Sequence, residues 1–132
     1  MIKKRNLPFC VPEYPEQDIP KILEKLKEVL LSGRLTQGPY VQEFEEKWKK
    51  YIGTKYAIAV NSCTAALHIA LECIGVKDEN EVIVPSFTFV ATANAVLFCN
   101  AKPIFAEINP RTLNIDPNDI KKKLTDKTKA II

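Results

Sequence analysis

The second half of the chain alternates between short apolar runs and stretches with helical spacing, and this alternation limits the possible folds more than any other feature. The expected strands cover residues 56–60, 81–84, 103–108 and a run that starts at 130, and the expected helices cover 64–74, about 89–98 and 117–124. Strands joined by single helices favour right-handed crossovers and a mostly parallel sheet that is buried on both faces. We therefore expect an α/β fold.

The first half of the chain reads differently. Residues 1–17 contain three prolines and predict an extended N-terminal arm, and residues 18–132 are expected to form part of one larger domain. Helical spacing predicts a helix that is capped by Asp18 and ends at Gly33. A second amphipathic helix is expected from about Val41 to Gly53.

The end of the sequence is apolar and predicts a strand that has only begun. Ala130, Ile131 and Ile132 follow the last expected helix after a short polar stretch. A new apolar strand needs a sheet to join, so we expect a fold that is incomplete at its C-terminus. The chain is then truncated, split, or completed by another polypeptide.

Charge and composition exclude several classes of function. The formal net charge is only +3, and the lysines are scattered among glutamates, so no nucleic-acid surface is expected. No apolar run is long enough to span a membrane, and the basic N-terminus lacks the apolar core of a signal peptide. We therefore expect neither nucleic acid nor a membrane as a partner.

The four cysteines do not show the close spacing of a zinc site or of a redox motif, so no metal site is predicted. Cys73 and Cys99 fall in apolar helical patterns and are expected to be small buried residues. A disulfide framework is not expected, which favours a reducing, cytoplasmic compartment. His68 has no second histidine or carboxylate motif nearby and is interpreted as a packed helix residue.

Two segments that join a strand to a helix could bind a ligand. Asn61 to Ala66 begins a helix, where free N–H groups and two hydroxyls could bind a phosphate group, although simple capping by Ser62 or Thr64 is the alternative. Pro85 to Thr92 carries Phe87 and Phe89, which could cover a planar ring or lie in the core. Ligands in open parallel sheets bind beyond the carboxyl ends of strands, so both segments would face one crevice.

A third segment, Gly33 to Pro39, is a polar loop bounded by glycines. Such a loop can bind a ligand or merely connect two helices, and the residues alone leave both interpretations open.

Five strings along the chain, in this order and at this spacing, resemble the DegT/DnrJ/StrS family of pyridoxal-phosphate aminotransferases. They are GRLTQGPYVQEFEEKW, AVNSCTAALHIAL, EVIVPSFTFVATANAV, AKPIFAEINPRTLNID and TDKTKAII, and the resemblance runs from about Asn6 to Ile132. It implies the N-terminal part of a fold-type-I aminotransferase large domain. It also implies a nucleotide-sugar substrate, an amino-acid amino donor, a role in pathways such as polysaccharide biosynthesis, and a homodimer with active sites at the subunit interface.

The resemblance assigns roles to particular residues. The family's binding turn for the phosphate of pyridoxal 5'-phosphate (PLP) falls on Ser62, Cys63, Thr64 and Ala65, with Cys63 where the common family string has glycine. The aromatic residue that stacks on the cofactor ring falls on Phe89. The loop near the substrate falls on Thr36, Gln37 and Gly38.

No catalytic residue is carried over. None of the lysines present matches the motif of the family's Schiff-base lysine, and the aspartate that pairs with the pyridinium nitrogen has no counterpart either. The chain alone is therefore expected to be inactive and to need a separate C-terminal half. Two alternatives remain: a binding module for a phosphorylated ligand without chemistry, and an inactive remnant that folds poorly.

Overall fold

A computed structural model describes residues 11–132, so most of the predicted arm lies outside the described residues. Residues 11–15 have no regular secondary structure, and a short 3-10 helix, η1, covers Glu16–Asp18. The chain divides into two compact units, one up to Ala59 and one from Val60 to Ile132. Each unit is described by itself.

Within residues 11–59, the first unit has two α-helices, α1 (Ile19–Ser32) and α2 (Pro39–Ile52). Both end as expected at a glycine in the left-handed conformation, Gly33 at φ 67° and Gly53 at φ 78°. The predicted side-chain cap at Asp18 is wrong. The backbone of Asp18 is already helical because it continues the 3-10 turn, and its side chain makes no capping hydrogen bond.

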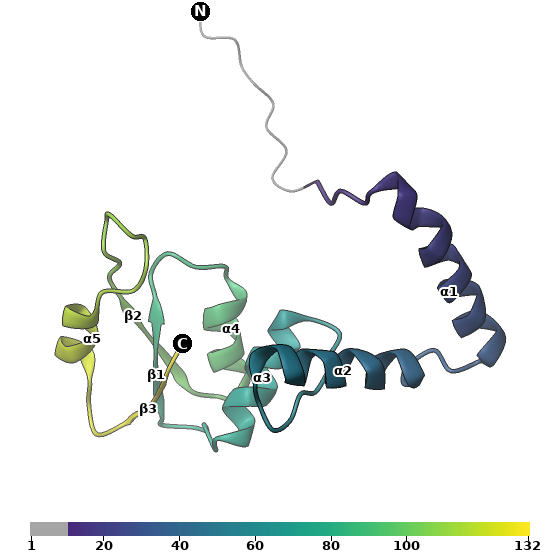
Figure 1. Cartoon of the computed structure of the whole chain (residues 1–132). Coiled ribbons are helices and arrows are strands. Elements are labelled where there is room, and N and C mark those ends of the chain that lie inside the picture. The colour runs from purple at the N-terminus through teal and green to yellow at the C-terminus, as the bar shows by residue number, and fades with distance from the viewer. Residues whose placement is uncertain (1–10) are drawn as a thin grey trace, which may run out of the picture. The chain divides into compact units, whose positions relative to one another are not determined.

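The second unit is a parallel sheet with helices in its connections (Figure 1). Its elements are α3 (Cys63–Cys73), β1 (Glu81–Pro85), α4 (Ala91–Phe98), β2 (Lys102–Ala106), α5 (Pro117–Lys123) and β3 (Thr128–Ile131). The strand order is β2-β1-β3, and Ile83 of β1 pairs with Ile104 on one side and Ile131 on the other. Both pairings are parallel, which confirms the predicted α/β fold class.

The central strand β1 is buried on both faces. Val82 and Val84 are fully buried and pack with Ala95 and Val96 of α4. Side chains alternate across a strand, so the equally buried Ile83 points to the other face. Figure 1 shows α4 and α5 on opposite sides of the sheet. A strand buried on both faces is what the continuous apolar run Val82 to Val84 predicts.

Two strand predictions need correction. Residues 56–60 form no strand, because no backbone ladder joins them to another segment within residues 11–132, and Tyr56 and Ile58 are largely exposed. One backbone group of this segment pairs with a side chain instead: Ala59 donates its N–H to Glu45 Oε1 of α2 at 2.8 Å. In addition, β2 ends at Ala106, and Ile108 forms an isolated antiparallel bridge with Ile115 instead.

None of the helices formed by residues 11–132 combines the length and the apolar character needed to cross a bilayer.

Candidate functional site

The turn before α3 is a helix cap. Ser62 has an extended backbone, with φ −158° and ψ 156°, and its Oγ accepts a hydrogen bond from the N–H of Ala65 at 3.1 Å. The capping interpretation of Ser62 is therefore confirmed. A serine in this position satisfies one of the donors that the first turn of any helix leaves without a partner.

Capping by Ser62 leaves part of this turn free. The first bond of the helix runs from the N–H of Ala66 to the carbonyl of Ser62 at 3.1 Å, so the N–H groups of Cys63 and Thr64 have no acceptor within the helix. The Thr64 hydroxyl makes no hydrogen bond within residues 11–132, and Cys63 is exposed. Two N–H groups and the hydroxyl of Thr64 can thus still reach an anion.

The segment after β1 is an exposed loop. Phe87 and Phe89 are 65% and 69% exposed, so the interpretation of these rings as core residues is wrong within the described chain. The helix α4 starts at Ala91, two residues later than expected, because the carbonyl of Phe89 accepts the N–H of Thr92 at 3.0 Å in a preceding turn. Phe89 is therefore held just outside the helix.

A hydroxyl pair anchors this loop to the helix. Thr88 Oγ1 and Thr92 Oγ1 lie 2.8 Å apart, and Thr92 is buried. At the other end of the loop, the N–H of Ser86 donates to the carbonyl of Ala106 at 2.8 Å, which continues the pairing of β1 with β2. The exposed phenyl rings thus stand on a loop that is fixed at both ends.

The packing of α3 against α4 relates the two segments. The His68 ring of α3 lies 5.5 Å from the Phe98 ring of α4, and Glu72 and Cys99 also approach each other. These contacts join the middle and the end of α3 to the end of α4, and each helix then leads into a strand of the parallel sheet, α3 into β1 and α4 into β2. The Ser62 turn and the Phe89 loop precede the opposite, N-terminal ends of the same two helices.

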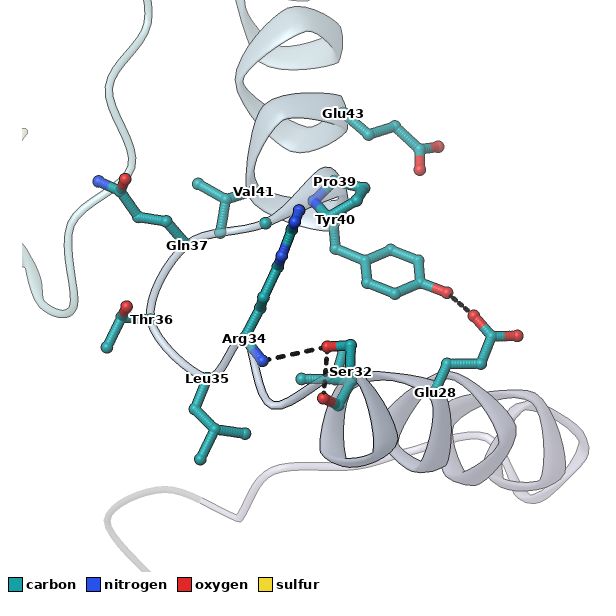
Figure 2. Close-up of a pocket in the computed structure, with 12 residues that line it drawn as sticks. Glu28, Ser32, Arg34, Leu35, Thr36, Gln37, Pro39, Tyr40, Val41 and Glu43 are labelled. Atoms are coloured by element: carbon teal, nitrogen blue, oxygen red, sulfur yellow. Dashed lines mark hydrogen bonds between the residues drawn. The ribbon is translucent and has the colours of Figure 1, made fainter.

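The predicted substrate loop lines a cavity of about 390 Å³ in the first unit. Thr36, Gln37 and Gly38 contribute to its wall, together with Arg34 (Figure 2). The loop starts from the end of α1, where the N–H of Arg34 donates to Ser32 Oγ at 3.1 Å. A loop that walls a cavity is better placed to bind a ligand than a plain connector.

Two residues of the cavity wall, Tyr40 and Glu28, could not be identified from local sequence patterns. Tyr40 donates its hydroxyl to Glu28, twelve residues earlier, across the opening shown in Figure 2. This hydrogen bond to Glu28 is the main reason that the pKa of Tyr40 is raised. The ammonium of Lys25 lies 4.5 Å from the centre of the Tyr40 ring, which favours the same position of the side chain.

The surroundings of His68 differ from expectation. Glu72, one turn later on α3, places Oε1 3.6 Å from His68 Nε2, a contact that the interpretation of His68 as a packed helix residue did not include. The spacing of four residues between His68 and Glu72, which puts both on one face of a helix, could have predicted this contact. Cys99 is buried as predicted, whereas the prediction for Cys73 is wrong, since this last residue of α3 is exposed.

Comparison with known proteins gives one consistent result. The model of the DegT/DnrJ/EryC1/StrS aminotransferase family matches residues 16–132. The spore coat polysaccharide biosynthesis protein SpsC of Bacillus subtilis (strain 168) is 42% identical over 134 residues, which cover 100% of this chain and 33% of SpsC. The 3-oxo-glucose-6-phosphate:glutamate aminotransferase of the same organism is 42% identical over 115 residues, covering 87% of this chain and 26% of that enzyme.

Solved structures agree. NtdA from Bacillus subtilis, with the cofactor PMP bound, superimposes with a TM-score of 0.84 at 39% identity over 98% of this chain and 31% of NtdA. An aminotransferase from Psychrobacter cryohalolentis gives a TM-score of 0.81 at 34% identity, over 94% of this chain and 31% of its own. The chain thus spans about a third of the length of the curated relatives that it matches.

Proposed function

Because the chain belongs to the DegT/DnrJ/EryC1/StrS aminotransferase family, we propose that it forms the cofactor-phosphate-binding part of a PLP-dependent aminotransferase acting on a keto-sugar nucleotide. The observation that carries the proposal is the first turn of α3, where the N–H groups of Cys63 and Thr64 remain free beside the Ser62 cap. A phosphate dianion is stabilised at such a turn by the N–H groups and by the helix dipole.

The residues at the two helix starts fit this cofactor. PMP, which is bound in NtdA, is the amino form of PLP, and both carry the same phosphate group and planar ring. Ser62, Cys63, Thr64 and Ala65 would form the phosphate turn: Ser62 and Ala65 close it through the cap, and the N–H groups of Cys63 and Thr64 with the Thr64 hydroxyl would bind the phosphate. The exposed ring of Phe89 would cover one face of the pyridine ring by offset stacking.

Bound PLP supplies an electron sink for the bonds that change at the amino-bearing carbon. The proposed role of this chain is to position the cofactor. The turn before α3 fixes one end of the cofactor, and the stacked ring fixes its plane. A cofactor held at two points loses the freedom to rotate, which is a main contribution of binding to catalysis.

We propose further that this 132-residue chain binds the cofactor without completing amino transfer. Lys77, Lys102 and Lys127 lie at or just before the start of β1, β2 and β3, whereas the Phe89 loop follows the opposite end of β1. Lys123 donates to the carbonyl of Phe105 at 2.7 Å and is occupied there. The loop that follows β1 and carries Phe89 therefore contains no lysine.

The substrate assignment rests on the cavity lined by Thr36, Gln37 and Gly38. The guanidinium of Arg34 in its wall can pair with a phosphate group of the acceptor, beside the carboxylates of Glu28 and Glu43. One relative is named for a sugar phosphate and for glutamate, which supports a keto-sugar acceptor and an amino-acid donor. The proposed acceptor here is a nucleotide sugar in particular.

We also propose that the assembly is cytoplasmic and that the chain works as a homodimer or with a separate polypeptide that carries the rest of the domain. Cys63, Cys73 and Cys99 are free thiols within the described chain, which fits a reducing compartment. Light scattering on the purified chain measures its mass in solution. A strictly monomeric chain that binds no polypeptide with the remaining family sequence would contradict the proposed assembly.

A comparison of PLP with pyridoxal, which lacks the phosphate, tests the proposed cofactor site. Equilibrium dialysis of the 132-residue chain should retain PLP more strongly than pyridoxal, and inorganic phosphate should compete with PLP. Equal retention of the two would contradict a phosphate-binding role for the turn. Incubation with PLP, glutamate and a keto-sugar nucleotide should give no amino sugar, and turnover would contradict the proposed inactivity of the chain alone.

A further inference from the structure

Three side chains with metal-binding atoms meet where α3 packs against the end of α4. The ligand atoms of His68, Glu72 and Cys99 all lie within 4.8 Å of one another. His68 and Glu72 lie four residues apart and share one face of α3, while Cys99 directly follows α4. The group therefore depends on the packing of two helices and is not a feature of one surface helix.

The structure holds each of the three in position. The His68 ring lies against the Phe98 ring, with centroids 5.5 Å apart, and its Nε2 is 3.6 Å from Glu72 Oε1. Cys99 is only 4% exposed, and its thiol donates to the carbonyl of Ala95 at 3.4 Å. A buried thiol at the end of α4 thus faces an imidazole and a carboxylate on α3.

The donor set and the spacing suit one class of metal ion. Imidazole nitrogen, carboxylate oxygen and thiolate sulfur are the three donor types of protein zinc sites, and bonds of about 2.0–2.3 Å place tetrahedral ligand atoms roughly 3.3–3.8 Å apart. The distance of 3.6 Å between His68 and Glu72 already lies in this range. We propose that His68, Glu72 and Cys99 form a three-ligand site for Zn²⁺ or a similar divalent transition metal.

Binding draws the three ligand atoms, which lie within 4.8 Å of one another, to the separations of a tetrahedral site. In the metal-free chain the Cys99 thiol keeps its proton, which it donates to the carbonyl of Ala95. The metal forms a bond to sulfur and displaces the thiol proton to the buffer, and the hydrogen bond to Ala95 is lost. His68 is partly exposed and Glu72 more so, which leaves the fourth position of the ion open to water.

This site is independent of the proposed cofactor site. His68 and Glu72 lie one and two turns beyond the N-terminal turn of α3, and neither belongs to the Ser62 turn or to the Phe89 loop. A metal ion here would join α3 to α4 beneath the two segments that are proposed to hold the cofactor. Binding of a metal ion at this site can be measured in the absence of PLP.

The test uses the 132-residue chain after treatment with a chelator, in a buffer free of phosphate and PLP. Native mass spectrometry with added zinc chloride should show one ion per chain. Cobalt chloride should produce the near-ultraviolet charge-transfer band of a thiolate bound to Co²⁺. The absence of a retained ion, or cobalt binding without a thiolate band, would overturn the proposal.

Variants separate this site from adventitious binding. His68→Gln and Cys99→Ser should each lower zinc affinity by at least about tenfold, since even the loss of a supporting residue around a metal has that effect. Cys73→Ser is the matched control, because Cys73 is an exposed thiol on the same helix as His68 and Glu72. This variant should leave zinc binding unchanged. Zinc binding that depends on Cys73 and not on His68 would also overturn the proposal. Because His68 is partly exposed, the His68→Gln variant should fold even if Cys99→Ser does not.

Discussion

Ser62 Oγ accepts the N–H of Ala65 at 3.1 Å, and this bond closes the first turn of α3. The same turn is proposed to receive the phosphate of the cofactor. Capping and anion binding can share the turn because they use different donors: the cap takes Ala65, and Cys63 and Thr64 remain available. Variants at Ser62 can therefore separate the stability of the helix from its affinity for a phosphate.

We expect Ser62→Ala to lower the free energy of unfolding by about 1 kcal/mol, because alanine removes the capping acceptor. Ser62→Asp restores an acceptor and should recover stability, yet its negative charge should weaken PLP binding by repelling the phosphate. Ser62→Asn is the neutral control and caps without the charge. Urea unfolding and PLP dialysis of the three variants measure the two effects. Equal PLP affinity for the Asp and Asn variants would place the phosphate elsewhere.

Phe89→Ala should weaken PLP retention, on the order of 1 kcal/mol beyond the lost contact area, because the proposed stacking on the pyridine ring is lost. Phe87→Ala is a matched control: the same side chain, in the same loop, with similar exposure. Its PLP affinity should stay close to that of the parent chain. Dialysis that shows the same loss for both variants would indicate a general effect on the loop, and no loss for Phe89→Ala would refute stacking.

Thr64→Val replaces a hydroxyl by a methyl group of similar size. The Thr64 hydroxyl has no hydrogen-bond partner within residues 11–132, so stability should change little. PLP affinity should fall by roughly 0.5–1.5 kcal/mol through one lost hydrogen bond. Calorimetric titration with PLP measures this change. If the affinity for PLP does not change, Thr64 takes no part in binding the phosphate.

The sequence predicted the elements whose signals are local. Glycines in the left-handed conformation end α1 and α2 where expected, and α5 begins at Pro117 as expected, where Asp116 accepts the N–H of Asn118 at 2.9 Å. The run Val82 to Val84 identified the central strand by its continuous apolar character. In each case a few neighbouring residues determine the outcome.

The predictions that failed depend on distant partners. Residues 56–60 are as apolar as a strand, but a strand exists only if another segment pairs with it, and no segment within residues 11–132 does so. Asp18 is a good capping residue whose backbone is already helical because of the turn before it. The bond between Tyr40 and Glu28, across a twelve-residue separation, depends on how α1 and α2 meet, which no local pattern specifies.

The candidate site likewise has a local part that could be predicted and a long-range part that could not. The Ser62 cap could be predicted because its partner is three residues away. The approach of Cys99 to His68 could not, because it is created by the packing of α3 on α4 over a distance of thirty-one positions in the chain. Sequence spacing suggested that no cysteine has a metal-binding partner, whereas the structure places one beside an imidazole and a carboxylate.

A carboxylate on α5 should make the stability of the second unit depend on pH. Asp119 Oδ2 accepts the N–H of Glu107, which follows β2, and the ammonium of Lys123, both at 2.7 Å. The backbone hydrogen bond from Glu107, followed by that from Lys123, lowers the pKa of Asp119 in the folded chain. A lowered pKa means that the ionised carboxylate stabilises the fold above the pKa of the unfolded chain, about 3.9. This contribution is lost as the pH falls through the lower, folded value.

Asp119→Asn should therefore be less stable than the parent chain at pH 7 and should lose less stability on acidification below about pH 4, because its amide does not titrate. Urea unfolding at pH 7 and at about pH 3 measures the two differences. Asp126→Asn is the control, since Asp126 is exposed and its side chain makes no hydrogen bond within residues 11–132. It should differ little from the parent at either pH. Parallel acid dependence of the Asp119 variant and the parent would show that α5 is held to the sheet by its apolar contacts and not by this carboxylate.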